Sequence, residues 1–152
     1  MSIDSRALFN VLTGYAASSG LFDSVTGHEP KAAPSPTGVS ASIWWAGTEP
    51  ILSSGVNSVS VRVEFQCRVY TTMLQEPQDD IDPRIMDAVD VMFTALIGDF
   101  DFGSQARYVD VLGSDGERLR AVPGYLTQDS KVFRVADIFI PVLVNDAYAE
   151  VA

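Results

Sequence analysis

The sequence predicts a single α+β domain over residues 1–152, with two main helices packed on one face of a mostly antiparallel or mixed sheet. Three observations predict this class. A long run of alternating apolar and polar residues indicates a strand with one buried face. Two stretches with helical spacing of apolar residues indicate the helices. The length suits one domain, and several shorter alternating segments supply the remaining strands.

The alternating run covers Ser58–Thr71 and predicts one long β-strand. Its apolar side carries Val59, Val61, Val63, Phe65, Cys67 and Val69. Its polar side carries Ser60, Arg62, Glu64, Gln66, Arg68 and Tyr70. Because a lone strand cannot bury a face by itself, the chain must supply a sheet and a layer that covers it.

The N-terminal third predicts a helix, a short strand and a longer strand. Apolar residues recur at helical spacing over Asp4–Ala17, with Ser2 or Asp4 as the cap. A short strand is expected within Leu21–Thr26, followed by a proline-rich loop over His28–Gly38. A strand over Val39–Trp45 follows, with Val39, Ala41, Ile43 and Trp45 on its apolar side and Trp44 on its polar side. Gly47–Val56 is expected to be a loop.

The second helix is expected to begin at Asp82-Pro83, with Asp82 as N-cap and Pro83 in the first turn, and to end at Gly98. Strands over Tyr108–Leu112 and Glu117–Val122 are predicted to flank the turn Gly113–Gly116. The last strand, Lys131–Asn145, is apolar on both sides from Ile138 to Val144, which is typical of a central strand. Pro141 conflicts with this position, unless a bulge or a locally unpaired edge accommodates it.

Charge is unevenly distributed along the chain, whose net charge is −10. Eight acids lie between Met73 and Asp101 against one base, Arg84; they are Glu76, Asp79, Asp80, Asp82, Asp87, Asp90, Asp99 and Asp101. This balance argues against a surface that wraps nucleic acid, because phosphate binding needs clustered Lys and Arg. The longest apolar stretch is too short to cross a membrane, and no membrane partner is expected.

Motifs for chemistry are absent from the sequence, and neither a cofactor nor a metal is expected. The sole cysteine, Cys67, is expected in the core. The acids Asp79–Asp82 are interpreted as satisfying a helix N-terminus rather than as metal ligands. A small enzyme that uses His28 and these acids is an alternative. It is a distant one, because no set of residues combines a base, a nucleophile and an orienting group.

Four side chains on the polar sides of the predicted strands Val39–Trp45 and Ser58–Thr71 are candidate contacts with another subunit or a partner. They are Trp44, Arg62, Glu64 and Arg68. Two interpretations of Trp44 stay open: burial within its own chain, or exposure as a contact residue, since tryptophan is enriched at interface hot spots. The three charged residues are either solvated or paired with a neighbouring chain.

Three segments resemble tail terminator proteins of long, non-contractile-tailed (siphovirus-type) bacteriophages. The first is Gly20–Pro30. The second is Arg68–Pro77 together with Ile81-Asp82-Pro83. The third is Gly124-Tyr125-Leu126 together with Lys131–Val135. The resemblance covers nearly the whole chain, and its motifs are not catalytic.

The resemblance implies a structural virion protein that forms a ring, usually of six copies. Such a ring caps the head-proximal end of the tail tube, stops its polymerisation and joins the tail to head connector proteins. The long strand is then expected to extend a sheet across a subunit boundary. Alternatives within the virion are a head–tail connector, a tail completion protein or a tail tube protein.

The implied place of the protein is the virion tail, after assembly in the host cytoplasm. DNA would pass through the lumen of the ring without specific binding. Asp79, Asp80, Asp99 and Asp101 are candidates for an acidic lumen that repels this DNA.

Overall fold

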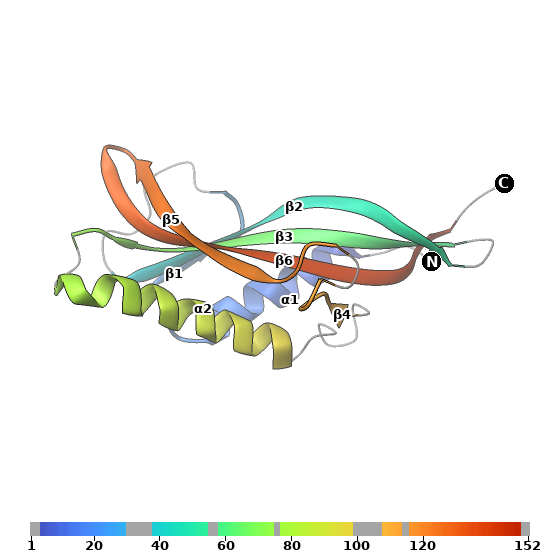
Figure 1. Cartoon of the computed structure of the whole chain (residues 1–152), viewed down its shortest axis with the longest axis horizontal. Coiled ribbons are helices and arrows are strands. Elements are labelled where there is room, and N and C mark those ends of the chain that lie inside the picture. Colours follow the sequence, from blue (N-terminus) through green and yellow to red (C-terminus); the bar gives the residue numbers. More distant parts are fainter. Residues whose placement is uncertain are drawn as a thin grey trace.

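A computed structural model describes residues 4–29, 38–54, 58–74, 77–98, 108–113 and 116–149. The elements in chain order are α1 (Ser5–Ser18), β1 (Ser24–Thr26), β2 (Val39–Ser54), β3 (Ser58–Thr72), the short 3₁₀ helix η1 (Gln78–Asp80), α2 (Ile81–Gly98), β4 (Tyr108–Val109), β5 (Arg120–Gln128) and β6 (Lys131–Ala149). They build the expected α+β domain, a sheet with both main helices on one side (Figure 1).

The sheet has six strands in the order β1-β2-β3-β6-β4, and β5 pairs with β6 beside β4. Only β1 and β2 run parallel; the other pairs are antiparallel. The long strand β3 therefore lies between β2 and β6. The expectation that this strand extends a sheet into another subunit is wrong, because both of its edges are already paired.

The helical layer covers the side of the sheet that the alternation predicted. Helix α1 buries Leu8, Leu12 and Ala16, and α2 buries Ile81, Ile85, Ala88, Met92 and Leu96. These side chains join the apolar side of β3 and the matching side of β2 and β6 in one core. Asp4 caps α1 as expected, since its Oδ1 accepts the Ala7 N–H at 3.0 Å.

The start of α2 differs from the prediction. The helix begins at Ile81, after the 3₁₀ turn η1, so Asp82 lies inside its first turn and is not the N-cap. Its carboxylate instead accepts from Nε of Arg134 at 2.9 Å. The carboxylate that the sequence assigned to helix capping therefore forms an ion pair with Arg134 on β6 instead.

Two sequence predictions about loops differ from the structure: the loop Gly47–Val56 is partly strand, and the turn Gly113–Gly116 does not join a hairpin. β2 runs through to Ser54, because Gly47 and Pro50 are accommodated by register shifts between Trp45 and Gly47 and between Pro50 and Leu52. The predicted hairpin around Gly113–Gly116 is wrong, since β4 and β5 each pair with β6 and not with one another. The true hairpin joins β5 to β6 through Asp129 and Ser130.

That turn contains two non-glycine residues in the left-handed region, Asp129 at φ 52° and Ser130 at φ 63°. Positive φ at both central residues defines a type I′ turn, whose twist matches that of the flanking strands. The turn fixes the register of β5, so Gln128 pairs with Lys131 and the last pair is Arg120 with Phe139.

Pro141 is tolerated within β6 because its nitrogen faces a gap. The Pro141 carbonyl accepts the Asp110 N–H at 2.9 Å, and in an antiparallel strand the nitrogen of the same residue points to that side. On that side β4 ends at Val109, opposite Val142, and β5 begins at Arg120, opposite Phe139, so the proline nitrogen lies between the two ladders. The locally unpaired edge expected from sequence is confirmed.

The long strands extend beyond the helical layer at one end of the molecule, and the β5–β6 hairpin curls away from it at the other (Figure 1). The side of the sheet that faces away from the helices is called the open face below. Most of the proline-rich loop, residues 30–37, lies outside the described residues. Among the described helices, none has the length and apolar character needed to span a membrane.

Candidate functional site

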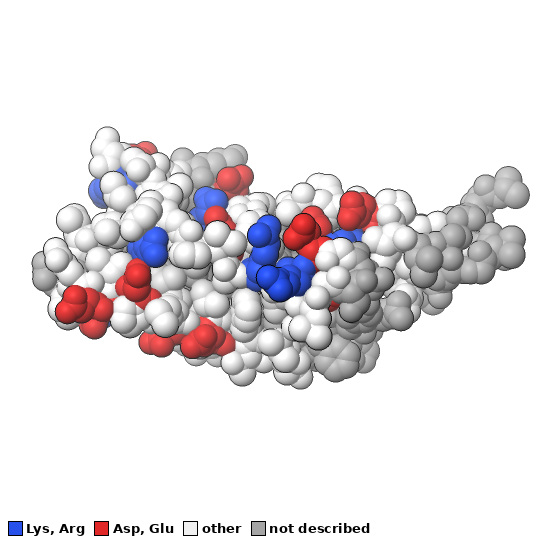
Figure 2. Space-filling view, in the orientation of Figure 1, with Lys and Arg blue, Asp and Glu red and all other residues white. Residues whose placement is uncertain are grey.

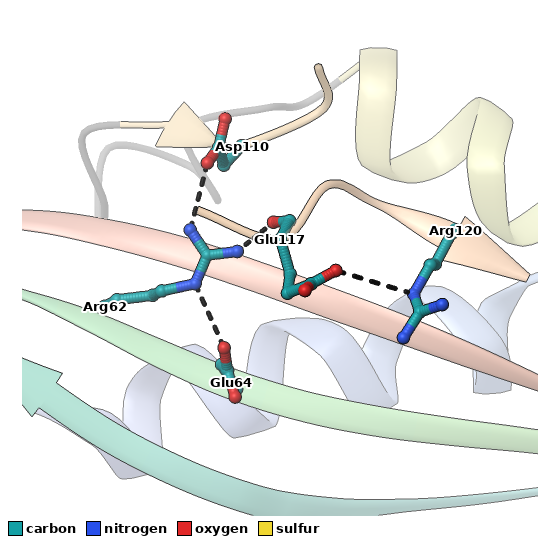
Figure 3. Close-up of polar contacts among 5 residues, drawn as sticks. All are labelled: Arg62, Glu64, Asp110, Glu117 and Arg120. Carbon is teal, nitrogen blue, oxygen red and sulfur yellow. Dashed lines mark hydrogen bonds and ion pairs between the residues drawn. The ribbon is translucent and has the colours of Figure 1, made fainter. Parts of the chain in front are cut away.

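The open face of the sheet carries a buried ion cluster around Arg62. Its Nη1 donates to Oδ2 of Asp110 at 2.9 Å, and both side chains are only 1% exposed. Its Nε donates to Oε1 of Glu64 at 3.0 Å, and its Nη2 donates to the Glu117 carbonyl (Figure 3). Arg62 was expected on a wet or partner-facing side, and that expectation is wrong.

The Arg62 cluster fixes the segment between β4 and β5 against the open face. The Leu119 N–H donates to the Asp110 carbonyl at 3.1 Å, which brings the two ends of this segment together. Gly116, at φ 145°, lies against the guanidinium, and a Cβ there would meet Nη1 of Arg62 at 2.9 Å. Arg62 is therefore a structural clamp in which three acceptors replace the water that a buried cation loses.

Arg68 lies on the same face of β3 as Arg62. Its Nε donates to Oδ1 of Asp137, its cross-strand neighbour on β6, at 2.7 Å. Its guanidinium also lies 5.3 Å from the ring centroid of Trp44, a cation–π contact that covers a half-buried indole. Trp44 is thus covered within its own chain by a neighbouring strand's arginine. Its role as a contact residue for another subunit stays a prediction, as do those of Glu64 and Arg68.

Trp45 departs from the alternation that placed it with Ala41 and Ile43 in the core. Ala41 and Ile43 are fully buried, whereas Trp45 is 60% exposed. A register shift follows immediately after Trp45, and its Nε1 donates to Oγ1 of Thr48 at 2.9 Å. The exposed tryptophan of this chain is therefore Trp45, which sequence alone assigned to the core.

A polar chain ties three strands together near the β5–β6 hairpin. Thr26 Oγ1 and Ser42 Oγ lie 2.6 Å apart, and Ser42 Oγ lies 2.6 Å from the Tyr70 hydroxyl. The Tyr70 ring meets Phe133 edge-on, with centroids 6.2 Å apart. Burial, opposed by the Ser42 hydrogen bond, raises the pKa of Tyr70 above 10.0, so the hydroxyl stays protonated at neutral pH.

The acidic residues of α2 and η1 gather along one border of the molecule, over α2 in Figure 2. Asp79 is exposed and Asp80 is partly exposed at the start of the helix. Asp82, with 62% of its side chain exposed, is held by Arg134, whose guanidinium also stacks 4.7 Å from the Tyr125 ring centroid. Asp99 and Asp101, the other acids assigned to a lumen, lie outside the described residues.

Cys67 and His28, the two side chains considered for nucleophilic chemistry, differ in their exposure. Burial raises the pKa of the Cys67 thiol from 9.0 to about 12, so it is neutral and enclosed in the core. His28 is exposed, on the chain between β1 and the undescribed loop. Among residues 4–29, 38–54, 58–74, 77–98, 108–113 and 116–149, no group of three or more His, Cys, Asp or Glu is placed to hold a metal.

No protein-family model matches the chain, and no curated protein matches it.

Sequence reasoning singled out Arg62 and Glu64 but missed the second acid that binds Arg62, Asp110, which lies 48 positions away from Arg62. The pairing depends on β4 and β3 reaching the same part of β6, and no local spacing reports that. The one available signal was Gly116, since a glycine in a polar turn often marks a close approach of backbone to another group.

Proposed function

We propose that this protein is a tail terminator: a structural virion protein that assembles as a ring of six copies on the head-proximal end of a phage tail tube. The ring stops polymerisation of the tube protein and offers a surface to the head connector proteins. No bond is made or broken in this role.

The observation that carries the proposal is the convergence of the three segments that resemble tail terminators. Thr26 of the first segment reaches Tyr70 of the second through Ser42. Tyr70 is the cross-strand neighbour of Val135 in the third segment, and Val135 pairs in turn with Gly124. Segments separated by up to a hundred residues thus occupy one end of the sheet.

The remaining part of the second segment joins the same end through Arg134. This side chain donates to Asp82 at the start of α2 and, through Nη1, to the Gly124 carbonyl at 3.2 Å. A resemblance spread over unconnected surface would suggest shared folding constraints only. A resemblance gathered at one end of the molecule supports a shared docking surface.

The two outer edges of the sheet carry features that hinder pairing with another strand, which favours a cap over a self-polymerising tube subunit. In the β5–β6 hairpin the pair Gln128 and Lys131 closes the turn, so the backbone groups of Ala121, Pro123, Tyr125 and Thr127 point away from β6. Pro123 removes one N–H donor from that outer edge. The outer edge of β2 carries Pro50 and two register shifts, devices that also hinder strand addition.

Negative-stain microscopy of the purified protein, alone and mixed with tail tubes, tests the proposal. We expect rings, or a cap at one tube end with tube growth halted. Open-ended tubes formed by this protein alone would make it a tube subunit. Protein that never contacts a tube, but binds purified head connectors, would make it a connector and overturn the proposal.

A further inference from the structure

The segment held down by Arg62 presents a basic and apolar surface, named here the arginine patch: Leu112, Arg118 and Arg120. Leu112 is 85% exposed, Arg118 is exposed, and the Arg120 side chain is 47% exposed. A Cβ on Gly113, next to Leu112, would be 3.2 Å from Cβ of Arg118, and Arg118 and Arg120 line one pocket.

The arginine patch borders a pocket of ≈ 190 Å³ whose lining includes Arg118, Arg120 and Phe139. The Arg120 guanidinium stacks 4.7 Å from the Phe139 ring centroid, which holds the cation over an apolar floor. The facing acids are already engaged: Glu64 binds Arg62, and Glu117 lies 4.0 Å from Arg120 (Figure 3). Arg118 adds a positive charge that none of these contacts uses.

A second surface of opposite character lies between α2 and β5 and is named the acidic groove. It is a pocket of ≈ 220 Å³ lined by Ile85, Met86, Val89, Asp90, Ala121, Pro123 and Ala136. Met86, 62% exposed, marks its mouth, with Asp82 and Asp90 one helical turn to either side. The groove is therefore apolar inside. Asp90 supplies negative charge at its rim, whereas the Asp82 carboxylate is paired with Arg134.

The two surfaces lie on opposite faces of the sheet. Arg120 stacks on Phe139 on the open face, whereas the next residue, Ala121, points to α2 and lines the groove. Successive strand residues alternate between faces, so one subunit cannot bring its own patch to its own groove. Two unlike, complementary surfaces on opposite faces suit a head-to-tail contact, which closes into a ring when the rotation between copies permits.

We propose that the arginine patch of one copy docks in the acidic groove of a second copy. Leu112 enters the groove beside Met86, and Arg118 and Arg120 face the Asp90 side of the rim. Charge complementarity sets the orientation, and the apolar pair supplies buried area. This contact deepens the proposed function, on which it rests, by naming the interface that joins the subunits of the ring.

Sedimentation analysis tests the interface with Arg118→Glu/Arg120→Glu and Asp90→Arg. We expect the parent to self-associate at about 0.01 M salt and to dissociate progressively towards about 1 M, as the Debye length falls from about 30 Å to about 3 Å. Each variant alone should associate at least about tenfold more weakly. An equimolar mixture of the two should recover association, because reversed patches meet reversed grooves and normal patches meet normal grooves.

The matched control is Arg6→Glu/Lys131→Glu, which makes the same change in net charge at two exposed positions outside both surfaces. It should associate like the parent. Variants that associate like the parent, a mixture that recovers nothing, or a parent that stays monomeric would overturn the interface. Capping of tail tubes is measured separately. Variants that cap tubes and associate normally refute this interface alone. A parent that associates through this interface but does not cap tubes refutes the terminator role alone.

Discussion

The carboxylate of Asp110 lies 2.9 Å from Nη1 of Arg62, and each of these two side chains is 1% exposed. The pair joins β3 to the segment between β4 and β5. Its burial makes the two charges depend on one another, because neither can recover water when the other is removed.

Removing one member of this pair should destabilise the protein strongly. We expect Asp110→Leu to lower the free energy of unfolding by about 3–5 kcal/mol, measured by urea denaturation, because the Arg62 charge is left buried without its main partner. The double variant Arg62→Met/Asp110→Leu should lose less than the two single variants summed. Arg120→Met, which breaks an exposed contact with Glu117, should cost about 0–1 kcal/mol. Additive losses would contradict the clamp.

Gly116 should be intolerant of any side chain. Its φ of 145° is rare for L-residues, and a Cβ would meet the Arg62 guanidinium at 2.9 Å. Gly116→Ala should therefore lower the free energy of unfolding by about 1–3 kcal/mol. Gly47→Ala is the control, since nothing lies within 4 Å of a Cβ there. Equal losses in the two variants would show that the close approach at Gly116 is not needed.

Cys67 should be inert in the folded protein. A thiol reagent should label it only as fast as the protein unfolds, because the thiol is buried and its pKa is raised to about 12. Since the folded pKa lies above 9.0, this thiol's contribution to stability is complete below pH 9 and is lost as the pH rises towards 12. Cys67→Ala should show a smaller alkaline loss of stability in urea titrations. Rapid labelling without unfolding would contradict this burial.

Restoring a donor to the outer edge of β5 should cause self-association. We expect Pro123→Val to form β-rich aggregates at concentrations where the parent stays dispersed, monitored by light scattering and thioflavin fluorescence. Thr127→Val on the same edge adds an apolar β-branched side chain without adding an N–H, and should stay dispersed. If both variants aggregate alike, added hydrophobicity and not the missing donor is the cause.

Neutralising the acids assigned to the lumen should affect DNA passage alone. We expect Asp79→Asn/Asp80→Asn/Asp99→Asn/Asp101→Asn to slow DNA ejection while tail length stays unchanged, because less negative charge would let DNA adhere to the ring. Tail length is measured by microscopy and ejection by DNA release. Defects limited to assembly would show that these acids do not line the lumen.

The fold class, both helices and the buried side of β3 were predictable from sequence because they depend on local periodicity. Ser58–Thr71 alternates so regularly that its apolar side meets the core as expected. The predictions that failed depend on which strands meet. The residues of Gly113–Gly116 are typical of a hairpin turn, but the flanking strands β4 and β5 each pair with β6 and not with one another.

The candidate site was predictable only in part. The polar side of β3 indicated Arg62, Glu64 and Arg68, but periodicity reports which side a residue faces and not what covers that side. Arg68 found a cross-strand carboxylate, which a sheet register would have predicted once β6 was known to be its neighbour. Asp110 required knowledge of the topology, and the exposure of Trp45 required knowledge of the register shift that follows it.

The central position of β6 has a consequence for synthesis of the chain. β3, β4 and β5 all precede β6 in sequence, and each of them needs β6 as a neighbour. Until the residues of β6 emerge, β3 has an unpaired edge and β4 and β5 have no partner among the described strands. A nascent chain therefore carries exposed strand edges for the time between making β3 and β6, the interval in which mispairing between neighbouring chains is most damaging.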